Sequence, residues 1–217
     1  MDRAEGAHLV YFADPMCSWC WGFAPVIQAI GERFGEDLPI RLVLGGLRPG
    51  NVEPMDDQAR AEMRGHWNHV QEASGQPFDW SFFQREGFVY DTEPASRAVV
   101  LMRRRGMAEA LAGLHRLQRA FYAEGLDITD RDQLAELAAE FGFDREGFRA
   151  GLDEPGTLRE TRADFTLAAQ SGVSGFPTLI AGGGTRDYAL LTHGFQPAQR
   201  LLPALERWLA GRGGRAA

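Results

Sequence analysis

Cysteine is nearly absent from this chain of 217 residues, which contains only Cys17 and Cys20. A disulfide-stabilised secreted scaffold needs more cysteines, spread along the chain. A structural zinc site normally needs four ligands, and five histidines are the main supplement available. The scarcity argues against both classes. It leaves two cysteines separated by two residues, an arrangement that favours redox chemistry.

Long apolar runs and an excess of positive charge are also lacking. No stretch approaches the ~18 uninterrupted apolar residues of a membrane-spanning helix. The 23 basic residues are outnumbered by 30 acidic ones, giving a formal charge of −7, whereas general nucleic-acid binders carry basic surfaces. Residues 1–6 lack the basic and apolar regions of a signal peptide. We therefore expect a cytoplasmic protein with neither a nucleic-acid nor a membrane partner.

The composition that remains is typical of a globular protein, with 44% hydrophobic and 24% charged residues. The length fits one large domain or two small ones, and it is sufficient to bury a substantial core. Disorder and fibrous structure are therefore not expected.

The first fifty residues predict a βαβ unit. Residues 9–13 and 40–44 are short apolar runs typical of buried strands, and residues 17–34 place apolar side chains at helical spacing. Such a unit favours parallel strands joined by a right-handed crossover. Pro25 lies inside the helical pattern, so we expect a kink or a delayed helix start there.

The middle of the chain, from about residue 54 to 171, is mostly helical in pattern. The apolar stripes of these segments are typical of core packing. Arg103, Arg104 and Arg105 follow one stripe and predict a solvated helix end, where cations suit the helix dipole.

The last fifty residues return to strand patterns. Residues 176–181 predict a strand that begins at a proline, Gly182, Gly183 and Gly184 predict a break, and residues 188–191 predict the partner strand. A closing helix is expected over residues 197–209. The order predicts one α/β domain interrupted by a helical insertion.

The cysteine pair follows the first predicted strand and opens the first predicted helix. A helix N-terminus stabilises a thiolate through its unpaired backbone amides and the helix dipole. Cys17 is therefore predicted as the exposed attacking thiol. Cys20, one turn further, is predicted to be more buried and to resolve the mixed disulfide. Two chance cysteines or half of a metal site are the alternatives.

Two segments together carry a resemblance to a known family. Residues 14–23 read Asp-Pro-Met-Cys-Ser-Trp-Cys-Trp-Gly-Phe, and residues 172–178 read Gly-Val-Ser-Gly-Phe-Pro-Thr. They resemble the DsbA-like thiol–disulfide oxidoreductases of the thioredoxin fold, in a cytoplasmic branch described as predicted protein disulfide isomerases. The resemblance implies an α/β thioredoxin core formed by residues 1–50 and 172–217. It also implies a helical insertion over residues 51–171 whose last helix packs on that core.

The resemblance also assigns residues. Cys17 matches the nucleophile and Cys20 the resolving cysteine, while Pro177 matches the family's cis-proline. Phe176 is expected to offer backbone groups to an extended substrate. Client proteins with thiols or disulfides and a thiol electron donor or acceptor are the implied partners. Glutathione is the implied redox partner, and no metal or tightly bound cofactor is expected.

Other residues near the cysteines have two interpretations. Asp14 either caps the turn into the helix or accepts a proton beside the pair. Trp19 either offers an apolar surface to hydrophobic clients or packs internally. His66 and His69 lie on one predicted helix, but nothing nearby in the sequence completes a metal site.

The sequence departs from the best-known periplasmic members of the family. Ser18 and Trp19 stand between the cysteines, where those proteins carry Pro-His. That histidine helps make them strong oxidants, so the resemblance does not extend to strong oxidising power. The direction of electron flow is therefore left open.

Two other functions remain open at this stage. Relatives with the same insertion, the kappa-type glutathione transferases and 2-hydroxychromene-2-carboxylate isomerases, commonly have serine in place of the first cysteine, and Cys17 argues against them. Glutathione adduct formation that survives Cys20→Ser would favour them. A holdase or partner-binding module with oxidant-sensing cysteines is the third possibility. Client protection by a variant lacking both cysteines would favour it.

Overall fold

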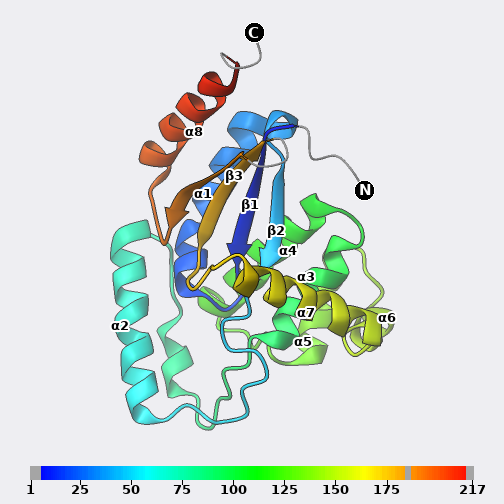
Figure 1. Cartoon of the computed structure of the whole chain (residues 1–217). Coiled ribbons are helices and arrows are strands. Elements are labelled where there is room, and N and C mark those ends of the chain that lie inside the picture. The colour runs from blue at the N-terminus through cyan, green and yellow to red at the C-terminus, as the bar shows by residue number, and fades with distance from the viewer. Residues whose placement is uncertain (1–5, 184–186, 214–217) are drawn as a thin grey trace.

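The computed structural model of the protein describes residues 6–183 and 187–213. In this part of the chain, a mixed sheet has the strand order β2-β1-β3-β4, and Figure 1 shows helices on both of its faces. The strands are β1 (His8–Ala13), β2 (Ile40–Leu44), β3 (Thr178–Gly183) and β4 (Asp187–His193). β1 and β2 are parallel, and β3 is antiparallel to both β1 and β4. The predicted βαβ unit is confirmed.

The helices connect and cover this sheet. In chain order they are α1 (Ser18–Phe34), η1 (Gly35–Asp37), α2 (Asp57–Ser74), η2 (Trp80–Gln84), α3 (Glu93–Arg103), α4 (Met107–Tyr122), α5 (Arg131–Ala139), α6 (Arg145–Gly151), α7 (Pro155–Gln170) and α8 (Ala198–Gly213). Those from α2 to α7 lie between β2 and β3 in the sequence, which confirms an α/β thioredoxin fold with a helical insertion. Within the described ranges, no helix is long and apolar enough to cross a membrane.

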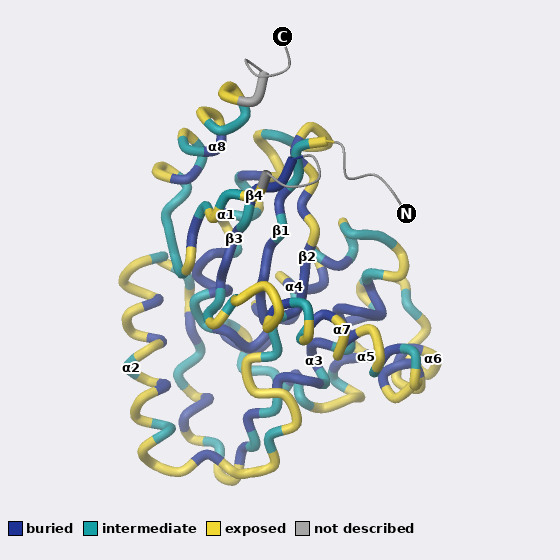
Figure 2. Tube along the Cα trace, in the orientation of Figure 1, coloured by how far each residue is buried: buried dark blue, intermediate teal, exposed yellow. Residues whose placement is uncertain are grey.

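Each face of the sheet has its own apolar layer because successive strand residues point in opposite directions. Leu9 and Tyr11 of β1 join the main core, which also includes Phe23 of α1. Phe12 points the other way and packs with Val43 of β2 and Ala168 of α7. Figure 2 shows the buried centre of the sheet and the exposed outer side of α2. The last helix of the insertion therefore packs against the sheet.

Helix α1 begins directly after Cys17 and continues through Pro25, so the expected delayed start is wrong. Proline has no N–H to donate to the carbonyl oxygen of Trp21, one turn earlier. The side-chain amide of Gln76 donates to that oxygen instead, at 3.1 Å. The segment after α2 therefore supplies the hydrogen bond that Pro25 removes.

The predicted boundaries of the last hairpin differ from those in the structure. β3 begins at Thr178, after Phe176 and Pro177, and continues through Gly182 and Gly183. These glycines were predicted as a break, but Gly182 pairs with His8 on β1 and with Tyr188 on β4. Backbone pairing with strands on both sides explains why they extend the strand. Gly184 lies outside the described residues.

The predicted solvated helix end is confirmed for Arg104 and Arg105, which are exposed at the end of α3, and is wrong for Arg103, which is partly buried. Arg103 pairs with Asp164 of α7 at 2.5 Å, and the same carboxylate accepts from the amide of Leu44 at 3.0 Å. Arg104 bonds to Thr157 and Glu160 of α7. These contacts fix α7 beside the end of β2.

Candidate active site

Cys17 lies at the N-terminus of α1, where the chain changes from a turn to a helix. It is the N-cap residue, and its sulfur accepts a hydrogen bond from the amide of Cys20 at 3.3 Å. Its thiol donates to the carbonyl oxygen of Phe176 at 3.5 Å. The Cys17 residue is only 6% exposed, so the prediction of an exposed thiol is wrong. The sulfur sits in a helix N-terminal site that suits a negative charge.

Cys20 lies one turn further along α1 and is fully buried. Burial raises the pKa of its thiol well above the usual value, and the neighbouring Cys17 sulfur raises it further. Tyr11 on β1 is buried beside the pair, and burial together with the two cysteines raises the pKa of its hydroxyl well above the usual value. Cys20 therefore retains its proton while the pair is reduced, and must lose it before acting as a nucleophile.

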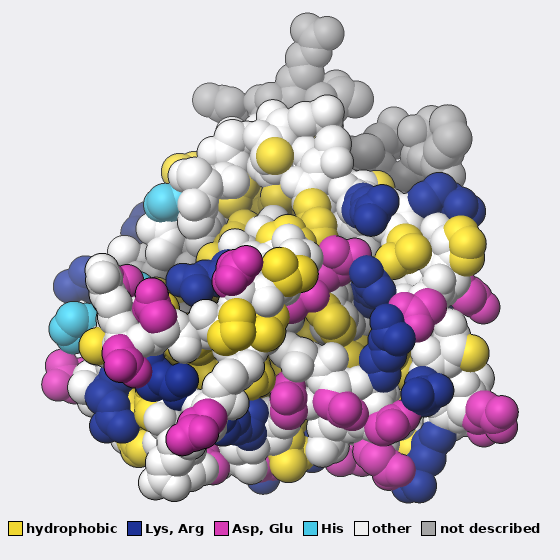
Figure 3. Space-filling model, turned by 90° about the horizontal axis from the view of Figure 1, so that it is seen from below, with side chains coloured by type: hydrophobic (Ala, Val, Ile, Leu, Met, Phe, Trp, Pro, Cys, Tyr) yellow, Lys and Arg dark blue, Asp and Glu magenta, His cyan; other side chains and the backbone are white. Residues whose placement is uncertain are grey.

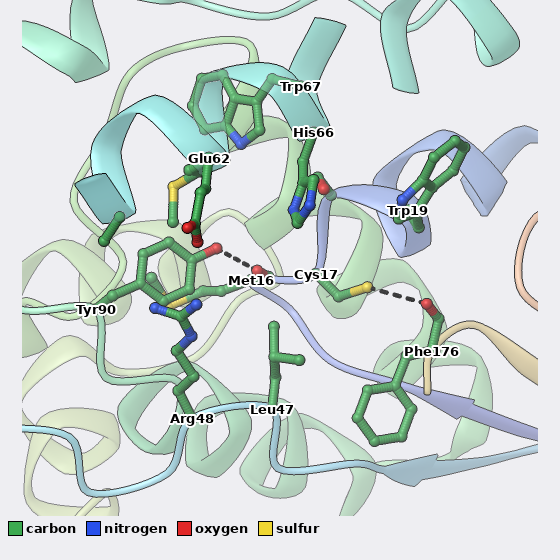
Figure 4. Close-up of a pocket in the computed structure, with 13 residues that line it drawn as sticks. Met16, Cys17, Trp19, Leu47, Arg48, Glu62, His66, Trp67, Tyr90 and Phe176 are labelled. Carbon is green, nitrogen blue, oxygen red and sulfur yellow. Dashed lines mark hydrogen bonds between the residues drawn. The ribbon is translucent and has the colours of Figure 1, made fainter. Parts of the chain in front are cut away.

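The segment before β3 lies against the cysteine pair. The Phe176–Pro177 peptide bond is cis, and Figure 4 shows the Phe176 carbonyl turned toward Cys17. The Phe176 ring packs over Gly45, where a Cβ would overlap it. Gly45 therefore gives this ring the space that any larger residue would take.

Asp14 holds the turn before Cys17 to the loop after β2. Its fully buried carboxylate accepts from the amide of Met16 at 2.9 Å and from the amide of Leu47 at 2.8 Å. Burial raises the pKa of this carboxyl to about 6, although these hydrogen bonds and one from Thr92 oppose the rise. Cys17 is the N-cap of α1 itself, and Asp14 caps the turn before it by accepting from the Met16 amide, which fits the first of its two interpretations.

Two buried tyrosines support the same turn from the helical insertion. The hydroxyl of Tyr90 donates to the carbonyl oxygen of Met16 and lies 3.3 Å from the hydroxyl of Tyr122. Trp21 is also buried. Its ring stacks near Tyr122, with centroids 6.5 Å apart, and its Nε1 donates to Pro77 at 3.0 Å. The insertion therefore forms one wall of the site.

Two hollows flank the cysteine pair. The first, of about 240 Å³, contains Cys17 and Phe176 together with polar side chains from the loop after β2 and from α2. Figure 4 shows Arg48, Glu62 and His66 pointing into it. The second, of about 230 Å³, is lined by Trp19, Ala73, Phe176, Gly194 and Phe195. Trp19 is partly buried, and its ring lies 5.9 Å from that of Phe195.

The structure brings together most of the residues that the sequence indicates. Asp14, Cys17, Cys20, Phe176 and Pro177 meet where β1 ends, and Trp19 lies at one side. No group of three His, Cys, Asp or Glu side chains among the residues described is placed to hold a metal.

The sequence analysis missed Tyr11, Arg48, Glu62 and Tyr90, which come from a strand, two loops and a helix. A strand pattern indicates that Tyr11 is buried, but it does not indicate which atom its hydroxyl meets. The other three are separated from Cys17 by many residues and carry no motif. His66 was considered only as a metal ligand, whereas it lines the first hollow.

Comparison with known families places this geometry among related proteins. The DSBA-like thioredoxin domain matches residues 8–206, which is most of the chain. The chain belongs to this family.

Solved structures of similar proteins agree with the family. One from Nitrosomonas europaea, provisionally described as a protein disulfide isomerase, is 37% identical with a TM-score of 0.88, and the match covers 95% of this chain and 99% of that one. The cytosolic disulfide reductase DsbM from Pseudomonas aeruginosa, solved with glutathione, is 27% identical with a TM-score of 0.74. That match covers 94% of this chain and 99% of DsbM. The fold and these neighbours support a thiol–disulfide oxidoreductase.

A curated relative has a different description. The ClpXP adapter protein SpxH of Bacillus subtilis is 25% identical over 169 residues, which are 77% of this chain and 56% of SpxH. The chain therefore spans little more than half the length of the curated relatives it matches.

Proposed function

We propose that this DSBA-like protein exchanges disulfides with protein thiols, with Cys17 as the nucleophile and Cys20 as the resolving cysteine. The observation that carries the proposal is the position of the Cys17 sulfur. It is the N-cap of α1, accepts the Cys20 amide at 3.3 Å and lies 3.5 Å from the Phe176 carbonyl oxygen. A thiolate there faces both its partner cysteine and the segment where a substrate backbone would bind.

The chemistry is a pair of thiol–disulfide exchanges. The Cys17 thiolate attacks one sulfur of a client disulfide, forms a mixed disulfide and releases the other client sulfur as a thiolate. Cys20, after losing its proton, attacks the Cys17 sulfur, closes the Cys17–Cys20 disulfide and releases the second client thiolate. The client gains two electrons and the protein loses them. A thiol donor then reduces Cys17–Cys20 by the reverse steps.

The residues around the pair have defined roles in this proposal. The backbone of Phe176, before the cis peptide bond, pairs with an extended client segment. Trp19 and Phe195 provide an apolar surface beside it. Asp14 holds the turn that positions Cys17.

We infer a cytoplasmic setting with glutathione as the redox partner, supported by the likeness to a cytosolic reductase solved with glutathione. Cytosolic glutathione is poised at roughly −220 to −320 mV. A pair more oxidising than this poise rests reduced and acts as a reductase or isomerase. Ser18 and Trp19 replace the residues associated with strong oxidants, which fits that direction.

Insulin reduction and refolding of a scrambled disulfide protein test this proposal. We expect Cys17→Ser to abolish both activities and Cys20→Ser to accumulate mixed disulfides through Cys17. Wild-type activity in Cys17→Ser would overturn it.

The presence of Cys17, where glutathione transferases and chromene-carboxylate isomerases of this fold commonly have serine, argues against those enzymes. Glutathione adduct formation with an aromatic electrophile in Cys20→Ser would favour those enzymes instead.

A partner-binding function is a second candidate because the chain is 25% identical to an adapter protein over 169 residues. In that case binding would not require the cysteines as electron carriers. The double variant Cys17→Ser/Cys20→Ser separates the two functions. Binding or protection of a client that persists in this variant supports the second candidate, and its loss together with exchange activity supports the first.

A further inference from the structure

The first hollow beside Cys17 carries charges that disulfide exchange itself does not require. It has a volume of about 240 Å³, slightly below the ~300–1,000 Å³ range of sites for drug-sized molecules. Arg48 and Glu62 project into it from different segments, the loop after β2 and helix α2 (Figure 4). We call it the Arg48–Glu62 pocket. Its size fits a ligand of a few residues.

Arg48 is held in place before any ligand arrives. Its backbone amide donates to the hydroxyl of Thr92 at 3.1 Å, and its carbonyl oxygen accepts from the amide of Thr92 at 3.2 Å. Its guanidinium lies 5.5 Å from the centre of the Tyr90 ring, a cation–π contact. Among the described residues, no carboxylate forms an ion pair with it. Arg48 therefore presents a positioned cation, outside any ion pair among the described residues, in the pocket that Cys17 also lines.

The rest of the molecule does not supply this positive charge. The chain has a formal charge of −7. Figure 3 shows acidic and basic side chains interspersed over the face seen from below, with no large patch of one sign. An anionic ligand therefore gains its attraction to this site from Arg48 rather than from the overall field.

Glu62 adds the opposite charge to the same pocket. One of its carboxylate oxygens accepts from the side-chain amide of Gln58 at 3.0 Å, which orients the group on α2. A carboxylate in this place favours a ligand with an ammonium group and disfavours one that is only anionic. The two charges together select a ligand that carries both a carboxylate and an amino group.

We infer that the Arg48–Glu62 pocket binds a low-molecular-weight thiol peptide with a free carboxylate and a free amino group, of which glutathione is the probe. Arg48 binds the carboxylate, Glu62 binds the ammonium group, and the ligand sulfur reaches Cys17. This inference rests on the proposed redox function and adds the residues that recognise the small redox partner. In this inference the charges of Arg48 and Glu62, and not only the Phe176 backbone, recognise the small thiol.

The reaction that uses the pocket is balanced with glutathione disulfide as the oxidant. The Cys17 thiolate attacks one sulfur, forms a Cys17–glutathione mixed disulfide and releases one glutathione thiolate. Deprotonated Cys20 then attacks the Cys17 sulfur, forms Cys17–Cys20 and releases the second glutathione thiolate. Two electrons pass from the cysteine pair to glutathione disulfide. The reverse sequence reduces the pair.

Rates of oxidation of the reduced protein by small disulfides test the role of Arg48. We compare glutathione disulfide with neutral bis(2-hydroxyethyl) disulfide in wild type, Arg48→Gln and Arg41→Gln. Arg41 is exposed on β2, outside the pocket, and its variant removes the same charge. We expect Arg48→Gln to slow the oxidation of the protein by glutathione disulfide about tenfold, as for the loss of one charge-assisted hydrogen bond. The rate of oxidation by the neutral disulfide is expected to stay the same in Arg48→Gln. Arg41→Gln is expected to change neither rate.

Charge variants test the two ends of the ligand separately. Arg48→Glu is expected to be oxidised faster by cystamine, a cationic disulfide, than by glutathione disulfide. Wild type is expected to prefer glutathione disulfide to 3,3′-dithiodipropionate, which has carboxylates and no amino groups. Glu62→Gln is expected to reduce this preference.

The outcomes distinguish this inference from the proposed function. If Arg48→Gln lowers the rate of oxidation equally with both disulfides, Arg48 acts on Cys17 rather than on the ligand. That result would overturn the inference. An unchanged rate with glutathione disulfide would also overturn it, while leaving the exchange activity intact. If no disulfide oxidises the wild-type pair, the proposed function itself fails.

Discussion

Protonation of Asp14 makes the stability of the fold depend on pH. Its folded-state pKa of about 6 lies above the ordinary value of 3.8 because of burial. The folded state therefore holds this proton more tightly than the unfolded chain. The stability that the proton contributes is complete below pH ~4 and is lost as the pH rises through ~6. The difference in pKa corresponds to on the order of 3 kcal/mol.

Asp14→Asn removes this titration. We predict that the free energy of unfolding of wild type falls relative to that of Asp14→Asn between pH 4 and pH 7, by on the order of 3 kcal/mol. Urea denaturation of both proteins at several pH values measures it. Parallel pH profiles for the two proteins would show that burial of Asp14 does not raise its pKa.

Gly45 sets the position of the Phe176 ring. A methyl group there overlaps the ring, so Gly45→Ala is predicted to displace Phe176 and cost about 1–3 kcal/mol of stability. In a Phe176→Ala background the overlap is gone, and the same substitution is expected to cost little. A double-mutant cycle by denaturant unfolding measures this coupling. Additive costs would contradict the packing argument.

The candidate site is predictable from sequence only where residues share a motif. Cys17 and Cys20 lie one turn apart, so their placement follows from local helix geometry. The glycine pair Gly45 and Gly46 indicates the end of β2 in the sequence. It does not indicate that a phenylalanine ring packs on each glycine. Arg103 was misassigned because its partner, Asp164, is 61 residues away. Long-range pairings of this kind depend on how the helices pack, which the local pattern does not specify.

At the scale of elements, helix α1 depends on the segment that follows α2. Gln76 donates to the Trp21 carbonyl that Pro25 leaves without its helical partner. The boundaries of α1 followed from its apolar spacing, whereas this compensation did not. Gln76 is 51 positions from Pro25, and no sequence pattern links them. The tertiary contact explains how a proline is accommodated within this helix.

We predict that Gln76→Ala costs about 1–3 kcal/mol, because a buried carbonyl loses its donor. Pro25→Ala restores a backbone N–H, so the Gln76→Ala cost should be smaller in the Pro25→Ala background. Thermal or urea unfolding of the four proteins measures the coupling. The same cost in both backgrounds would show that Gln76 acts through another contact.

At the scale of the whole molecule, the chain joins a thioredoxin-fold sheet to a block of helices that forms one wall of the cysteine site. Cys17 lies where three segments meet: the end of β1, the loop after β2 and the segment before β3. Tyr90 and Tyr122 reach the same turn from the insertion. The insertion is therefore part of the site, and it lines the hollow beside Cys17.

The reduction potential of the Cys17–Cys20 pair tests the central claim most directly. The protein is equilibrated in graded glutathione buffers, free thiols are alkylated, and the oxidised fraction is read by mass. We predict a reversible intramolecular disulfide with a reduction potential below about −120 mV, the value of the strong oxidant DsbA. Failure to form this disulfide at any ratio of reduced to oxidised glutathione would contradict the account.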